Sequence, residues 1–79
     1  MLIRVKLFAT LVQHRPGTQA GVPFTWEAPA DASVGDLIAH LGLPAAEVKV
    51  VFVNGRARPL TWVLHDNDEV GIFPPIGGG

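Results

Sequence analysis

A single helix-length segment, residues 33–42, stands in a chain whose other apolar residues follow strand patterns. Ser33 can accept hydrogen bonds from the first amides of a helix, and Asp36 can complete a capping box three residues later. Gly42 provides a left-handed stop. The apolar stripe has helical spacing: Val34, Leu37, Ile38 and Leu41. One helix of this length can cover one face of a small sheet, which predicts a two-layer α+β domain.

Strand patterns precede this helix. In residues 3–7 apolar and cationic side chains alternate with a period of two, as in a half-buried strand. Residues 9–14 can form a short helical turn. Residues 22–28 place Phe24 and Trp26 on one face, so we expect them to pair with the first strand as a hairpin.

Strand patterns also follow the helix. Residues 48–53 form a nearly continuous apolar run that is too short for a helix and ends in Asn54-Gly55, a strong hairpin signal. We expect this run to be a central strand. A return strand over residues 56–60 is limited by Pro59.

The last strand, residues 69–73, follows a turn over residues 66–68. The long connection between the first and last strands allows them to lie side by side in parallel. The order of elements therefore fits a β-grasp (ubiquitin-like) fold, with a mixed sheet of four to five strands and one main helix packed on one face. We expect this domain to span residues 1–73.

Composition restricts the chemistry of the 79-residue chain. It has no cysteine, so it cannot form disulfides or carry a persulfide. The formal net charge is -1 and the basic residues are scattered, which argues against nucleic acid as a partner. The three histidines lack ligand spacing, so no metal site is expected. The apolar run 7–12 is too short for a signal peptide, and we expect a soluble cytoplasmic protein without membrane contact.

The final residues differ from the rest of the chain. Pro74 and Pro75 cannot donate to a sheet and should end the last strand. Ile76 and three glycines, Gly77, Gly78 and Gly79, follow. Residues 74–79 are expected to be an extended, flexible tail that can enter a slot admitting only backbone and deliver the carboxylate of Gly79. A glycine-rich end is also typical of a merely disordered terminus.

Three segments resemble the MoaD/ThiS family of ubiquitin-like sulfur carriers, most closely those that serve as the small subunit of molybdopterin synthase. They are residues 3–9 (IRVKLFA), residues 53–55 (VNG) and residues 66–79 (DNDEVGIFPPIGGG). The last segment is the most specific. Asn67 stands where the family usually has glycine, but asparagine also tolerates a left-handed backbone conformation. Gly77 stands where the family has a small serine or alanine, and this change leaves the tail length the same.

The resemblance implies a carrier without an active site of its own, a non-catalytic sulfur-donating subunit of molybdopterin synthase. An adenylating enzyme of the ubiquitin-activating type would use ATP and Mg to form an acyl-adenylate on Gly79, and a persulfide donor would convert it to a thiocarboxylate. The tail would then enter the large synthase subunit for molybdenum cofactor biosynthesis. Two alternatives stay open: a sulfur carrier for thiamin thiazole, cysteine or a secondary metabolite, and a ubiquitin-like protein modifier.

The sheet face opposite the helix is a possible docking surface. We expect it to carry the following side chains: Leu2, Arg4, Lys6, Phe8 and the stems of Arg56 and Arg58. An ordinary solvated sheet face is the alternative. The expected core includes Val5, Leu37, Ile38 and Phe52. Trp62 falls outside any clean alternation and is interpreted either as a contact aromatic or as a lid on the core edge.

Overall fold

The computed structural model describes residues 1–75; Ile76, Gly77, Gly78 and Gly79 lie outside the described residues. Its elements are β1 (Leu2–Leu7), the 3-10 helix η1 (Ala9–His14), β2 (Phe24–Glu27), α1 (Val34–Leu41), the 3-10 helix η2 (Ala45–Glu47), β3 (Val50–Val53), β4 (Arg56–Ala57) and β5 (Glu69–Phe73). Each segment expected to be regular is present, with shorter bounds for β2, β3 and β4.

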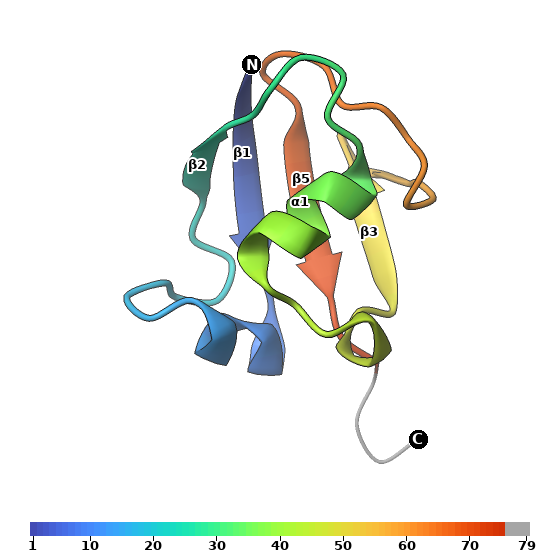
Figure 1. Ribbon diagram of the computed structural model, residues 1–79. Helices are drawn as coiled ribbons and strands as arrows, with labels where there is room; N and C mark the ends of the chain where they lie inside the picture. The colour runs from blue at the N-terminus through green and yellow to red at the C-terminus, as the bar shows by residue number, and fades with distance from the viewer. Residues whose placement is uncertain (76–79) are drawn as a thin grey trace.

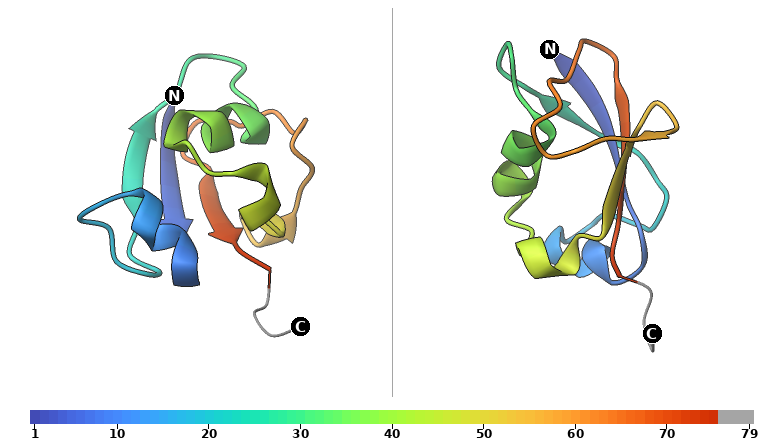
Figure 2. Two further views of the ribbon diagram at one scale, coloured as in Figure 1. Left: turned by 60° about the horizontal axis from the view of Figure 1, so that its bottom comes forward. Right: turned by 90° about the vertical axis from the view of Figure 1, so that its right-hand side faces the viewer.

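The strands form one mixed sheet in the order β2-β1-β5-β3-β4 (Figure 1). β1 and β5 are parallel, with Arg4 opposite Glu69 and Leu7 opposite Ile72, whereas the other neighbouring strands are antiparallel. α1 lies across one face of this sheet (Figure 2). This is the expected β-grasp arrangement, and the parallel pairing of the first and last strands is confirmed.

The ends of α1 are set by the residues that the sequence indicates. Ser33 Oγ accepts a hydrogen bond from the Asp36 amide at 3.1 Å, and Asp36 Oδ2 accepts one from the Ser33 amide at 2.8 Å. Gly42 ends the helix with a φ of 68°. The capping box and the left-handed stop are therefore confirmed.

The segment 58–65 is hydrogen-bonded to the start of α1. The amides of Val34 and Gly35 donate to the carbonyls of Trp62 and Leu60 at 2.9 and 2.8 Å. These bonds satisfy two helix amides that lack a partner within the helix. A Cβ on Gly35 would lie 3.3 Å from the Leu60 carbonyl oxygen, so glycine permits the close approach.

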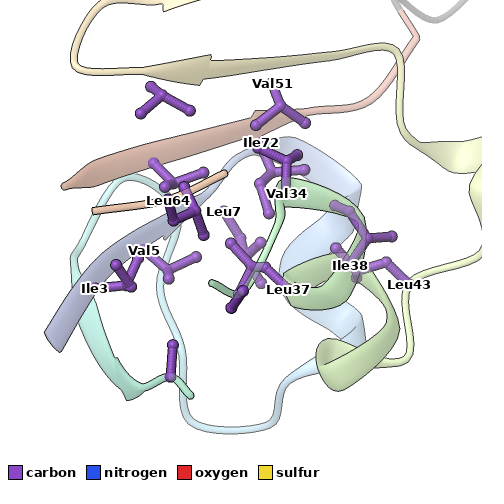
Figure 3. Close-up of a cluster of buried hydrophobic side chains, with 14 of the residues drawn as sticks. Ile3, Val5, Leu7, Val34, Leu37, Ile38, Leu43, Val51, Leu64 and Ile72 are labelled. Atoms are coloured by element: carbon purple, nitrogen blue, oxygen red, sulfur yellow. The ribbon is translucent and has the colours of Figure 1, made fainter. Parts of the chain in front are cut away.

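The core lies between α1 and the sheet and is entirely aliphatic. Leu37 of α1 lies near Leu7 of β1, Ile38 lies beside Leu43, and Leu64 lies among the other buried side chains (Figure 3). Val5 and Leu37 are fully buried and Ile38 nearly so, as expected. Trp62 is partly buried and packs against the core, which confirms its interpretation as a lid.

Phe52 is not part of this core, and that expectation was wrong. It is only partly buried, while its neighbours Val51 and Val53 are buried. Alternation along β3 directs Phe52 to the face opposite α1. An apolar run indicates that both faces of a strand are partly covered, but it does not tell which residues face the helix.

No helix within residues 1–75 combines the length and the apolar character that crossing a membrane requires.

Candidate functional site

An aromatic pocket occupies the sheet face opposite α1. Its volume is about 480 Å³. Its lining residues are Lys6, Phe8, Phe52, Asn54, Gly55, Glu69, Gly71 and Phe73. They come from β1, β3 and β5, from the residue that follows β1 and from the turn between β3 and β4. We call this set the aromatic pocket below.

Strand register brings the aromatic rings together. The parallel pairing of Leu7 with Ile72 places the next residues, Phe8 and Phe73, side by side. Their rings stack with centroids 4.2 Å apart and an interplanar angle of 5°. Phe52 meets Phe73 edge to face at 5.5 Å. All three rings remain partly exposed, so they offer a preformed apolar surface to a partner.

Gly71 forms the floor of the aromatic pocket. A Cβ at this position would lie 3.4 Å from Phe73 Cε2 and 3.5 Å from Phe8 Cε2. These are ordinary contact distances, so the fold itself does not exclude a side chain at position 71. Glycine there keeps the space beside the edges of the two stacked rings open.

An ion pair lies along the rim of the pocket. Lys6 Nζ is 2.8 Å from Glu69 Oε1. The hydrogen bond from Lys6 and its positive charge hold the pKa of Glu69 below its ordinary value, with a smaller contribution from the charge of Arg4. Both side chains are partly solvent-exposed, so the pair adds specificity to the rim rather than much stability.

The chain leaves the sheet beside this pocket. The Phe73 carbonyl accepts a hydrogen bond from the Lys49 amide at 2.8 Å, and Pro74 has no N–H to continue the ladder. Pro74 is partly buried and Pro75 is exposed. The proposed slot residues Ile76, Gly77 and Gly78, and the proposed reactive residue Gly79, lie outside the described residues.

The structure brings some of the expected docking residues together and separates others. Lys6 and Phe8 line the aromatic pocket, whereas Arg56 and Arg58 do not. Arg56 pairs with buried Val53 across the hairpin and therefore shares its face. The Arg58 guanidinium lies 3.9 Å from the centre of the Trp62 ring. The expectation that these arginines lie beside Phe8 was wrong, because Arg56 shares the helix-side face of Val53 and Arg58, after β4, stacks on Trp62.

The histidines lie apart in the structure. His14 bonds to Glu47 at 2.9 Å, and His40 stacks on Trp26 at 4.9 Å between ring centres. Within residues 1–75, no three side chains of the metal-binding types form a group.

Sequence reasoning missed the roles of Phe52, Glu69 and Gly71 in the aromatic pocket. The available signal was the strand parity together with the parallel pairing of the first and last strands. Once Leu7 is set opposite Ile72, alternation predicts that Lys6, Phe8, Gly71 and Phe73 share a face. Because every residue of β3 is apolar, the sequence does not show that Phe52 lies on this same face.

Comparisons with known proteins agree on one family. A family model described as the ThiS family matches residues 5–79. The solved structure of SAMP1 from Haloferax volcanii is 29% identical, with a TM-score of 0.74 and 100% of both chains covered. No curated protein sequence gives a significant match.

Two further solved structures are similar. A putative molybdopterin converting factor, subunit 1, from Pyrococcus furiosus is 28% identical with a TM-score of 0.75, over 96% of this chain and 99% of that one. Subunit 1 or 2 of the molybdopterin-converting factor complex from Helicobacter pylori matches at 21% identity and a TM-score of 0.63, over 100% of both chains. At that identity the second likeness supports the fold alone.

Proposed function

This chain belongs to the ThiS family of ubiquitin-like sulfur carriers, and we propose that it carries sulfur as a thiocarboxylate on Gly79. The acceptor that we propose is the large subunit of molybdopterin synthase, which makes this chain the small subunit. The observation that carries the proposal is the aromatic pocket at the end of β5, directly before Pro74 and Pro75. This pocket would give a partner enzyme a docking surface beside Pro74 and Pro75.

The chemistry requires partners for both energy and sulfur. A terminal carboxyl titrates near ~3.3–3.7, so at neutral pH it is an anion that nucleophiles do not attack. The chain has no P-loop motif and no cysteine. An adenylating enzyme would therefore supply ATP and Mg and release pyrophosphate on forming the Gly79 acyl-adenylate. A persulfide donor would then displace AMP and form an acyl disulfide on Gly79. A second thiol of the donor system would cleave the S–S bond, which releases the thiocarboxylate and leaves a disulfide on the donor. The need for ATP makes the cytoplasm the expected location.

Docking of the folded domain would compensate for a weakly binding tail. Ordering each flexible residue costs about 1–2 kcal/mol of backbone entropy. Buried aromatic side chains are among the residues that contribute most to protein interfaces. The aromatic pocket would thus hold the domain on each enzyme while Pro74 and Pro75 direct the remaining residues, Ile76 to Gly79, into a narrow slot.

The nature of the acceptor rests on the relatives. The Pyrococcus furiosus relative is described as a molybdopterin converting factor subunit, and the Helicobacter pylori structure is a complex of subunits 1 and 2. The Pyrococcus furiosus relative favours a large subunit as the acceptor. A second solved structure of SAMP1 is described as small archaeal modifier protein 1, and the SAMP1 fold is as similar to this chain as that of the Pyrococcus furiosus relative. A protein modifier is therefore the second candidate, ahead of a thiazole or cysteine pathway.

Intact-mass spectrometry tests the proposed carrier. After incubation with ATP, the cognate adenylating enzyme and a persulfide donor, the chain should gain the mass that accompanies replacement of one oxygen by sulfur. A variant lacking Gly79 should melt as the wild type does and gain nothing. A sulfur gain in the truncated variant would refute the assignment to Gly79.

A second measurement separates the two candidate acceptors. A modifier forms isopeptide bonds to lysines, which appear as higher-mass conjugates that resist reducing agents. A molybdopterin synthase subunit instead transfers its sulfur to the substrate held by the large subunit and regains its original mass. Conjugates in place of this return would favour the modifier.

A further inference from the structure

A second, basic pocket of about 210 Å³ lies at the β3–β4 hairpin, on the side of the sheet that α1 covers. Three of its lining side chains are cationic or can become so: Arg56, Arg58 and His65. We propose that this basic pocket binds the carboxylate of an acidic side chain from a partner protein. The inference stands on this region alone and does not rest on sulfur transfer at Gly79.

Arg58 stacks on an aromatic ring, and within residues 1–75 its Nε has no hydrogen-bond acceptor. Its guanidinium lies 3.9 Å from the centre of the Trp62 ring. Stacking covers one face of the guanidinium and leaves the terminal N–H groups at its edge for a carboxylate, which matches their fork geometry. Within the described residues, Arg58 Nε is buried and has no hydrogen-bond partner. A buried donor without an acceptor is unfavourable, and an incoming anion gives this arginine the counter-ion that it lacks.

The pocket does not neutralise its own charge. Asp68 is its acidic lining residue, and it is 8% exposed. Asp68 Oδ1 accepts a hydrogen bond from Asn54 Nδ2, and its Oδ2 accepts one from the His65 amide, both at 2.8 Å. Within residues 1–75, neither Arg56 nor Arg58 takes part in a salt bridge. Both arginines are thus available to a carboxylate from outside.

An apolar shelf beside the pocket favours a protein over a free anion as the source of the carboxylate. Trp62 and His65 line both the basic pocket and a neighbouring apolar hollow that also includes Val63. Leu60 and Val63 are large apolar residues left 54% and 43% exposed. Tryptophan and arginine next to exposed aliphatic side chains are typical of the centre of a protein interface. A free anion would contact none of this apolar surface.

The segment that carries these residues is fixed before any partner arrives. Ser33 and Val63 form a β-bridge, and the Leu64 amide donates to the Ala32 carbonyl at 2.8 Å. Leu64 itself is buried in the core. A rigid segment loses little entropy on binding, which suits a docking site.

The basic pocket and the aromatic pocket lie on opposite sides of β3. Val53 and its partner Arg56 face the helix side, while Phe52 and its partner Ala57 face the open side. Asn54 lines both pockets, but the arginines of the basic pocket and the rings of the aromatic pocket lie on opposite faces, so a partner bound at the arginines leaves the rings accessible. The domain could be held at one surface while enzymes exchange at the other.

A titration followed by NMR tests the proposal. The probes are the peptide N-acetyl-Leu-Glu-Leu-amide and its Gln counterpart, added to the complete ¹⁵N-labelled chain. We expect the Glu peptide to shift the Arg58 Nε–H, the Trp62 indole N–H and the His65 amide. The Gln peptide should bind roughly tenfold more weakly, since it lacks the charge that strengthens hydrogen bonds to arginine.

Two variants complete the test. Arg58→Gln should weaken binding of the Glu peptide roughly tenfold or more. Arg15→Gln is the matched control, because Arg15 also stacks on an aromatic ring, that of Phe24 at 4.1 Å, but lines neither pocket. Arg56→Gln alters an exposed residue and should weaken binding even if Arg58→Gln fails to fold.

Four results would overturn the proposal. They are equal binding of the Glu and Gln peptides, shifts centred on the aromatic pocket, equal losses in Arg15→Gln and Arg58→Gln, and binding of acetate or inorganic phosphate as tight as that of the peptide. The last result would indicate a site for free anions. None of these results bears on whether Gly79 forms a thiocarboxylate, so the two proposals can fail separately.

Discussion

The two faces of the sheet are built from alternate residues of the same strands, yet they differ in almost every property. On the helix side, Val5 and Leu7 of β1 are fully buried. On the open side, Lys6 and the adjoining Phe8 are partly exposed and line the aromatic pocket. The difference shows how one short sequence can assign the buried core to one face and leave the other face, which we propose for recognition, partly exposed.

The same division runs through β5, where Val70 and Ile72 are buried while Gly71 and Phe73 line the pocket. A domain of this size buries only ~60–65% of the surface of its unfolded chain, so it depends on the aliphatic face for its stability. The open face can then vary without unfolding the protein. Changes to the two faces should accordingly have separable effects.

The largest effect on stability is expected from the helix side. Leu37→Ala removes a fully buried side chain and should lower the free energy of unfolding by about 2–5 kcal/mol, a large part of the total for a small domain. Thermal melting measures this loss. Leu60→Ala, at a side chain that is 54% exposed, should change the melting temperature little. Equal losses in the two variants would mean that α1 does not cover the core.

A substitution on the open face should separate binding from stability. Gly71→Val places methyl groups against the edges of the stacked Phe8 and Phe73 rings, where even a Cβ would be in contact. Binding to the adenylating enzyme should weaken roughly tenfold or more, while the melting temperature stays the same or rises because valine favours strands. Calorimetric titration and thermal melting measure the two effects.

Gly71→Ala provides a graded control for this experiment, because its single methyl group fills less of the pocket and should weaken binding less than valine does. If the valine variant bound the enzyme with unchanged affinity, the pocket could not be the docking surface.

The smallest effect concerns the ion pair on the open rim. Because Lys6 lowers the pKa of Glu69 below its ordinary value of 4.5, the pair stabilises the fold above that pH. Its contribution is lost as the pH falls through the lowered pKa. The melting temperature of the wild type should therefore fall more steeply below pH 4.5 than that of Glu69→Gln.

Glu27→Gln is the control for the ion pair, since Glu27 takes part in no salt bridge within residues 1–75. This control should keep the steep profile of the wild type. Parallel profiles for the wild type and Glu69→Gln would show that the rim contributes nothing to stability.

Local signals made most of the fold predictable. Ser33 and Asp36 mark the start of α1 because their hydrogen bonds depend only on residues three apart. Asn54 and Gly55 form the tight hairpin turn with φ values of 52° and 83°, as that dipeptide predicts. These features need no knowledge of the rest of the chain.

Which residues share the open face depends on the register between β1 and β5, so the sequence predicts this set only in part. The stack of Phe8 on Phe73 joins residues at opposite ends of the chain, and it follows only from the pairing of β1 with β5. The sequence does not show which sheet face Phe52 lies on, because every residue of β3 is apolar. The sequence does not indicate that Arg58 stacks on Trp62, because this contact depends on the path of the irregular segment after β4.

The most direct test of the claim that the open face recognises the partner enzyme is the rate of thiocarboxylate formation in the wild type and in Phe73→Ala. Intact-mass spectrometry measures this rate. With limiting adenylating enzyme, the variant should load sulfur roughly tenfold more slowly. With saturating enzyme its rate should approach that of the wild type, since Gly79 is unchanged. Its melting temperature should fall less than that of Leu37→Ala. A wild-type rate for Phe73→Ala at limiting enzyme would contradict the account, because the open face would then play no part in recognition.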